Sequence, residues 1–194
     1  MIRYLGRFRV VAIRDGSRGD ALKMLEQSTS EGVSGIKLSP FERSMDYNPW
    51  SLWKRAERLG LIVSSLGRVE EFASKGFFRL VSLVRDLIIV LDHLVGIRVQ
   101  DKDSLKVYRQ ALELSNYPNV KIKVGGLGDI CEGRSCLVNE LHMYPNSEGI
   151  EMGLQAFGKK CMMWGSDYPS VSNREGYRNA LDGVKNYPAF KTDE

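Results

Sequence analysis

Near its C-terminal end the chain reads Met162-Met163-Trp164-Gly165-Ser166-Asp167-Tyr168-Pro169. An apolar segment that predicts a strand runs directly into a Gly-Ser-Asp sequence, which predicts a turn and puts a carboxylate just beyond the strand. A carboxylate in that position can ligate a divalent metal ion and accept a proton from metal-bound water. Asp167 can also be a turn or helix-capping aspartate, and the spacing leaves both interpretations open.

The same order, an apolar run followed by a helical pattern, recurs along the chain. The expected strands lie at residues 8–13, 33–38, 61–65, 87–91, 119–124 and 161–164. The expected helices lie at about 20–32, 48–60, 69–84, 103–115, 148–157 and 174–185, with Pro49 in the first turn of the second. Successive βα units predict a parallel sheet, and no linker divides the chain, so we expect one domain over residues 1–194.

A closed barrel and a doubly wound sheet both fit this pattern. A dinucleotide-binding sheet carries a glycine fingerprint in its first βα turn. Gly16-Ser17-Arg18-Gly19 lies there but lacks the spacing, whereas Gly125-Gly126-Leu127-Gly128 follows a later strand. The second cluster is either a strand end or a phosphate cradle, which keeps a phosphate-binding or nucleotide-binding domain among the hypotheses.

Composition excludes several classes of protein. The chain has 194 residues, 43% of them hydrophobic, and its net charge of +4 comes from basic residues spread along the sequence. Without a basic cluster we expect no nucleic-acid partner. The longest apolar stretch, 87–95, is too short to cross a membrane, and no signal peptide is visible. An odd number of cysteines at uninformative spacing favours a reducing compartment, so we expect a cytoplasmic protein.

The chain has only two histidines, His93 and His142. His93 follows Asp92 at the carboxyl end of the strand at 87–91, where an Asp-His pair could act in acid–base chemistry or an imidazole could bind a metal. The alternative is a histidine bonded to a neighbouring backbone carbonyl. His142 lies in the long connection 127–147, where a role in loop packing is the default. Its neighbours Cys131 and Cys136 lack the spacing of a common structural zinc site.

In their order along the chain, these segments resemble the amidohydrolase-related family, a branch of the amidohydrolase superfamily. Residues 163–169 resemble its last-strand motif, and residues 90–94 its strand ending in Asp-His-Leu-Gly, although Val95 comes before the glycine here. Three further segments, 118–127, 32–38 and 7–12, are similar to the strands that the family has before and between these two. The resemblance therefore covers nearly the whole chain.

The resemblance implies a TIM barrel that acts on a small molecule, commonly with one divalent metal ion, often zinc. Relatives include hydrolases of lactones and amides and decarboxylases of aromatic or unsaturated acids. It also implies that Asp167 and His93 are the catalytic and metal-binding residues. Lys37 and Lys123, near strand ends, could meet a substrate carboxylate, or they could be ordinary barrel lysines with buried stems.

The chain also departs from the family pattern. The family's first strand ends in His-x-His, which is absent here, so we expect an incomplete barrel of about six of the eight βα units. Leu66 stands where a further histidine would follow the strand at 61–65. A catalytic zinc ion needs three protein ligands, so we expect little metal-dependent hydrolase activity. The alternative is an inactive barrel fragment that binds a partner, or a second copy of itself, over its exposed sheet edges.

Overall fold

The computed structural model describes residues 7–13, 15–97, 102–125 and 147–190. Within them, one parallel sheet runs in the order β1-β2-β3-β4-β5-β6. The strands are β1 (Val11–Ile13), β2 (Gly35–Leu38), β3 (Ile62–Ser65), β4 (Ile89–Leu91), β5 (Val120–Gly125) and β6 (Met162–Gly165). A strand order equal to the chain order is that of a barrel, because a doubly wound sheet reverses its order at a switch point.

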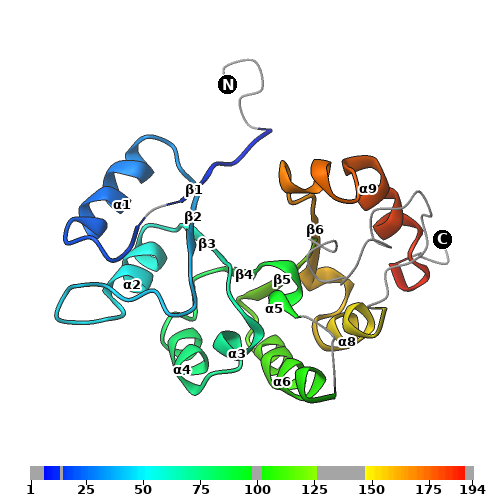
Figure 1. Ribbon diagram of the computed structural model, residues 1–194. Helices are drawn as coiled ribbons and strands as arrows, with labels where there is room; N and C mark the ends of the chain where they lie inside the picture. The colour runs from blue at the N-terminus through cyan, green and yellow to red at the C-terminus, as the bar shows by residue number, and fades with distance from the viewer. Residues whose placement is uncertain (1–6, 14, 98–101, 126–146, 191–194) are drawn as a thin grey trace.

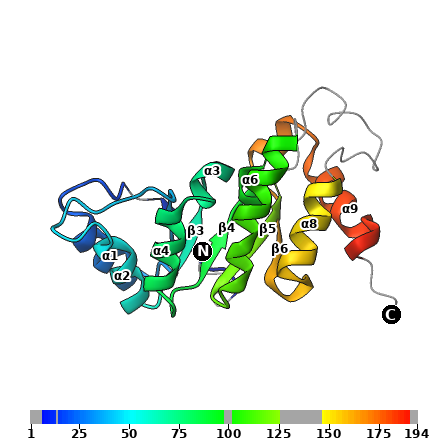
Figure 2. The same ribbon diagram turned by 90° about the horizontal axis from the view of Figure 1, so that it is seen from below.

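Helices connect the strands along the outside of the curved sheet. They are α1 (Ala21–Ser30), α2 (Ser51–Arg58), α3 (Val69–Phe72), α4 (Lys75–Leu83), α5 (His93–Gly96), α6 (Lys102–Leu112), α8 (Ser147–Phe157) and α9 (Tyr177–Asn186). Short 3-10 turns, η2 (Glu113–Asn116), η4 (Lys159–Cys161), η5 (Ser170–Asn173) and η6 (Pro188–Phe190), complete the order. Figure 1 shows α1, α2, α4, α6, α8 and α9 following one another in an arc, and Figure 2 shows α4, α6 and α8 running alongside the strands.

Three helix predictions were wrong in detail. The helix expected at 69–84 is divided into α3 and α4, because the Ser74 hydroxyl accepts a hydrogen bond from the backbone N–H of Phe77 and begins a new helix. Pro49 lies before α2 rather than in its first turn. The last helix begins at Tyr177 rather than near 174, since η5 and Gly176, with a φ of +81°, separate it from β6. Residues 127–146 of the connection expected at 127–147, with its cysteines and His142, lie outside the described residues.

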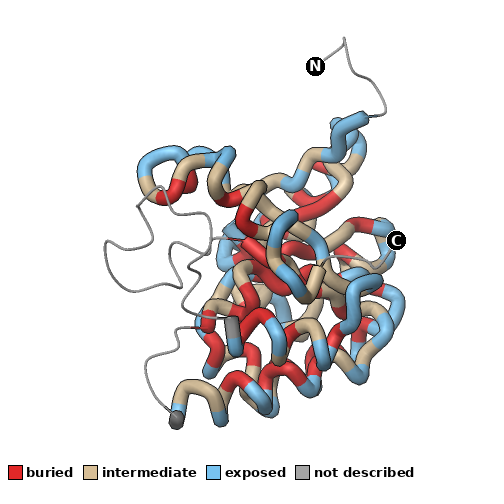
Figure 3. Tube along the Cα trace, turned by 90° about the vertical axis from the view of Figure 1, so that its right-hand side faces the viewer, coloured by how far each residue is buried: buried red, intermediate tan, exposed pale blue. Residues whose placement is uncertain are grey.

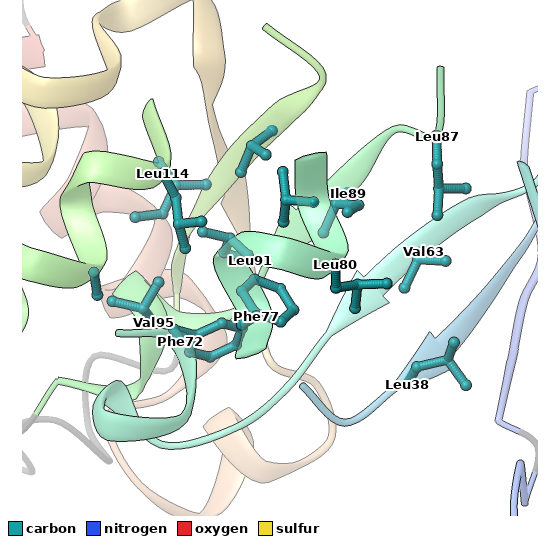
Figure 4. Packing of buried hydrophobic residues seen from close by; sticks show 14 of the residues in the cluster. Leu38, Val63, Phe72, Phe77, Leu80, Leu87, Ile89, Leu91, Val95 and Leu114 are labelled. Carbon is teal, nitrogen blue, oxygen red and sulfur yellow. The ribbon is translucent and has the colours of Figure 1, made fainter. Parts of the chain in front are cut away.

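Alternate residues of the strands form the core under the helices. Ile36, Val63, Ile89, Leu91 and Ile122 are completely buried on this face. Phe72 and Phe77 cover it with their rings in edge-to-face contact at 5.2 Å between centroids, close to Leu91 in Figure 4. Each such side chain contributes about 1.5–3 kcal/mol through burial. Figure 3 shows the buried residues gathered inside the molecule and the exposed ones on the outer turns of the helices.

The other face of the sheet is polar at its centre and apolar at one edge. Lys37, Ser64, Val90 and Lys121 are in register across β2 to β5 on this inner face. Ile13, at the β1 edge, is 76% exposed. The inner face therefore directs polar side chains of neighbouring strands toward one another. The assignment of residues 1–194 to one domain stays a prediction.

Candidate functional site

The four residues expected at the site lie near or just beyond the carboxyl ends of four strands. Lys37 belongs to β2 and Lys123 to β5, while His93 follows β4 and Asp167 follows β6. Parallel strands end at the same edge of a sheet, where the βα loops of barrel enzymes form the active site. The structure groups these residues into two adjoining clusters. We call them the lysine cluster (Lys37, Ser64, Asp92 and Lys123) and the histidine cluster (His93, Asp167, Arg174 and Glu175).

Asp92 is the centre of the lysine cluster and is only 1% exposed. Lys123 Nζ lies 2.5 Å from Asp92 Oδ1 and Lys37 Nζ lies 3.1 Å from Oδ2. The Ser64 hydroxyl lies 2.9 Å from both oxygens and can donate to either. Burial acts to raise the pKa of Asp92, but the hydrogen bond and charge of Lys123, then the charge of Lys37 and the Ser64 hydroxyl, outweigh it, so the pKa lies below its ordinary value.

The lysine cluster changes the interpretation of the Asp92-His93 sequence. The carboxylate of Asp92 pairs with the two lysines and Ser64, so Asp92 is not the partner of His93 in the Asp-His pair that the sequence left open. The reason is local backbone geometry. Asp92 has extended backbone, and its N–H donates to the Ser65 carbonyl oxygen at 2.9 Å. His93, by contrast, begins a turn with left-handed backbone.

That turn, α5, has left-handed backbone at every residue. The φ angles of His93, Leu94, Val95 and Gly96 are +51°, +49°, +55° and +68°. A left-handed conformation costs roughly 1–2 kcal/mol per non-glycine residue. Complete burial of Leu94 and Val95 offsets part of this cost. Asp167, with a φ of +55°, is also left-handed, so both expected catalytic residues lie on strained backbone of the kind that collects at functional sites.

The histidine cluster brings Asp167 to His93 and adds two residues that the sequence did not predict. Asp167 Oδ1 lies 3.6 Å from His93 Nε2, and Asp167 Oδ2 accepts a hydrogen bond from Arg174 Nη2 at 2.7 Å. Arg174 Nε lies 3.2 Å from Glu175 Oε2. His93 Nδ1 is buried and has no hydrogen-bond partner within the described part of the chain. The one sequence signal for Arg174 and Glu175 was a charged pair in the connection that follows the last-strand motif.

The donor atoms do not fit a catalytic zinc site. Such a site takes three protein ligands at about 2.0–2.3 Å and leaves one position for water. His93 Nε2 and Asp167 Oδ1 supply two donors, and residues 7–13, 15–97, 102–125 and 147–190 contain no group of three His, Cys, Asp or Glu side chains that could hold a metal ion. Arg174 holds the other oxygen of Asp167. Leu66, at the position where the family resemblance predicts a histidine, supplies no side-chain donor.

The two clusters carry opposite charge. Two lysines and one aspartate give the lysine cluster an excess of +1, while two carboxylates and one arginine give the histidine cluster −1 before His93 is counted. The Lys37 and Lys123 side chains are 31% and 26% exposed, so both side chains are partly open to solvent. An ammonium has three N–H donors, and neither lysine needs all of them for Asp92. The site is therefore suited to an anionic group at one end and proton transfer at the other.

A parallel sheet with strands in chain order, helices outside it and ionisable side chains beyond its carboxyl edge defines an α/β protein of the TIM-barrel class, here with an incomplete barrel. The particular family follows from a sequence profile described as amidohydrolase, which matches residues 1–193. The chain belongs to the amidohydrolase family. A search of curated proteins found no match. None of the described helices is long and apolar enough to span a membrane.

Solved structures agree with this fold. An amidohydrolase from Burkholderia multivorans with bound HEPES has a TM-score of 0.76 at 17% identity over 95% of this chain and 67% of its own, and another crystal form of an amidohydrolase from that organism holds zinc. A putative 2-pyrone-4,6-dicarboxylic acid hydrolase from Pseudomonas putida has a TM-score of 0.69 at 19% identity, over 94% of this chain and 66% of its own. A 2,6-dihydroxybenzoate decarboxylase from Rhizobium has a TM-score of 0.56 at 15% identity, over 95% of this chain and 69% of its own. The chain thus spans about two thirds of each, and identities this low show the fold alone.

Proposed function

We propose that the chain binds a small organic carboxylic acid, or a lactone or amide that carries a carboxylate, and acts on it as an amidohydrolase-type hydrolase. The observation that carries this proposal is the lysine cluster, in which Lys37 and Lys123 share the single buried carboxylate of Asp92. The remaining positive charge is accessible, and a substrate carboxylate would neutralise it through charge-assisted hydrogen bonds. Similar folds that bind or act on small carboxylic acids support the same substrate class.

The histidine cluster is the candidate for the reacting end of the substrate. With the substrate carboxylate on the lysines, the bond to be broken would lie toward His93, which directly follows Asp92. We assign His93 the role of proton acceptor, and Asp167, 3.6 Å away, the role of orienting the imidazole. Asp92 would act as a positioning residue that holds both ammonium groups. No step of this proposal passes through a metal ion, since the described donors do not form a metal site.

A second candidate function is binding of the same acid without turnover. The contact that favours it is between Arg174 and Asp167, since it occupies one oxygen of the residue that the family resemblance makes catalytic. In that case the lysine cluster would still bind a carboxylate, and His93 would not act as a proton acceptor. The two candidates share a ligand and differ in whether a product forms.

Both candidate functions require that the chain binds a small carboxylic acid, so binding is the first measurement. Thermal shift and calorimetry with phthalate, malonate and 2-pyrone-4,6-dicarboxylate would compare the wild type with Lys37→Met and Lys123→Met. Losing one charge-assisted hydrogen bond costs about 1.5–3 kcal/mol, so we expect affinity to fall by roughly 10-fold to 150-fold. Lys121→Met is a matched control, because this lysine lies on the same face of β5 but contacts the Pro118 carbonyl and Cys161 Sγ instead.

Turnover then decides between the two. Hydrolysis of a panel of lactones and amides, followed by chromatography, would support the hydrolase if it disappears in both His93→Gln and Asp167→Asn. Lysine-dependent binding with no product, measured with and without added zinc, would support the binding protein. If no carboxylate binds in a way that depends on Lys37 or Lys123, both candidates are wrong.

A further inference from the structure

Arg174 lies between two carboxylates in the histidine cluster. Its Nη2 donates to Asp167 Oδ2 at 2.7 Å, and its Nε lies 3.2 Å from Glu175 Oε2. All three side chains are largely buried, with 18%, 21% and 7% of their surfaces exposed for Arg174, Asp167 and Glu175. The guanidinium therefore fills the space between these two acidic groups and supplies the positive charge that they require.

The backbone after β6 holds Arg174 in this position. The N–H of Val171 donates to the Asp167 carbonyl oxygen at 3.0 Å, and the N–H of Arg174 donates to the Val171 carbonyl oxygen at 3.3 Å. Gly176 closes the turn with a 2.8 Å bond to the same Val171 oxygen, and the Val171 side chain is completely buried. These hydrogen bonds hold the turn in a conformation in which the Arg174 side chain contacts Asp167. A guanidinium stays protonated in proteins, so this charge is permanent.

The two carboxylates that contact the guanidinium and the imidazole beside Asp167 are donors that a divalent ion would use. Imidazole and carboxylate both suit zinc, and carboxylate also suits manganese. The 3.6 Å between His93 Nε2 and Asp167 Oδ1 is close to the roughly 3.4 Å that separates two ligands of one tetrahedral zinc ion. Glu175, on the far side of the guanidinium, would be the third donor. These three side chains do not form a metal-binding group among the described residues, and Arg174 contacts two of them, Asp167 and Glu175.

We infer that Arg174 is a built-in cation that takes the place of a divalent metal ion among His93, Asp167 and Glu175 and keeps such an ion out. An ion on Asp167 would face the guanidinium at close range, and the two positive charges repel each other. Removing the guanidinium takes away the positive charge that it supplies to two carboxylates, and these carboxylates with one imidazole are a donor set that zinc can occupy. This inference goes beyond the proposed function and depends on no substrate.

Zinc binding to the full chain tests it, with zinc alone as the probe. Calorimetry, and metal content after equilibrium dialysis, would compare the wild type with Arg174→Met, Arg174→Gln and the double variant Arg174→Met/Asp167→Asn. Arg178→Met is the matched control, because this exposed arginine pairs with Asp182 on α9, away from the site. We expect both Arg174 variants to bind about one zinc ion per chain at least tenfold more tightly than the wild type. The gain should be absent from the control and lost in the double variant.

Two results would overturn the inference. One is stoichiometric zinc in the wild type that Asp167→Asn removes, because the arginine would then not exclude the ion. The other is folded Arg174→Met and Arg174→Gln proteins, judged by circular dichroism, that gain no Asp167-dependent zinc. Neither result bears on carboxylate binding by the lysine cluster, so a failure here is distinct from a failure of the proposed function.

Discussion

Replacing Asp92 by asparagine would remove one negative charge from between two ammonium groups while nearly preserving the shape of the side chain. Asp92 is 1% exposed and has Lys123 Nζ at 2.5 Å and Lys37 Nζ at 3.1 Å. Breaking a buried ion pair from one side costs about 3–5 kcal/mol, because the partner's charge is left uncompensated. The lysine side chains are 26% and 31% exposed, so water can take up part of that charge. We therefore expect unfolding free energy to fall by about 2–4 kcal/mol.

Urea-induced unfolding followed by tryptophan fluorescence and circular dichroism would measure this loss. For a chain of this size it corresponds to a melting temperature lower by roughly 4–16 °C. Asp182→Asn is the control, because it breaks an exposed ion pair with Arg178 that is expected to contribute only about 0.3–0.5 kcal/mol. A loss for Asp92→Asn no greater than that of the control would refute the argument that the buried carboxylate holds the lysine cluster together.

The same pair of proteins gives a pH dependence with a defined sign. The pKa of Asp92 is lower in the folded chain than its ordinary value of 3.8. Its contribution is therefore fully present above that ordinary value and is lost as the pH falls through the lower folded-state value. The stability difference between wild type and Asp92→Asn should stay constant from about pH 8 to pH 5 and shrink below about pH 4. A difference that grew on acidification would contradict the assignment.

Three further substitutions test the turn and the lysine cluster, with Gly60→Ala as the control for the first. Gly96→Ala would place its Cβ 2.3 Å from the Gly67 carbonyl oxygen at a φ of +68°, whereas Gly60→Ala, at +65°, has nothing within 4 Å. In urea unfolding we expect a loss of about 1 kcal/mol for Gly60→Ala and at least about 2 kcal/mol more for Gly96→Ala, and equal losses would exclude the close approach. Gly165→Ala would bring a Cβ to 2.6 Å from Lys123 Cδ and so displace the lysine side chain. Calorimetry should then show weaker phthalate binding than in the wild type. Unchanged affinity would argue against Lys123 as a residue that binds the carboxylate. Ser64→Ala removes a hydroxyl 2.9 Å from both Asp92 oxygens and should cost about 1–2 kcal/mol in urea unfolding, a value that a neutral result would contradict.

The sequence predicted the sheet well because its signals were local. The run at 87–91 is apolar on both faces, which predicts a strand of a parallel sheet, and β4 lies within it. The strand begins only at Ile89, since the Leu87 N–H turns back to the Val84 carbonyl oxygen and Asn119 Nδ2 binds both the Val84 and Leu87 carbonyl oxygens. The two Asn119 contacts join segments far apart in the chain, so the local sequence pattern could not show them.

Of the site, the sequence predicted only which residues lie near the carboxyl ends of the strands. Lys37, His93, Lys123 and Asp167 were expected at one edge because parallel strands end together. Their pairing was not predictable, because it depends on backbone angles near the strand ends. The extended backbone of Asp92 sends its carboxylate to the lysines, while the left-handed turn at His93 sends the imidazole toward Asp167.

Arg174 shows why a shared motif does not fix the chemistry around it. The residues from Gly165 to Pro169 resemble the family's last-strand motif, and that resemblance implies an aspartate that binds a metal ion. The partner of that aspartate is decided seven residues later, by a turn that returns to the Asp167 carbonyl oxygen and brings a guanidinium to its side chain. An arginine supplies positive charge and hydrogen bonds but cannot lower the pKa of a bound water as zinc does. The lysine cluster therefore serves recognition of an anion, and in the proposed hydrolase activation of water would depend on His93 rather than on a metal ion.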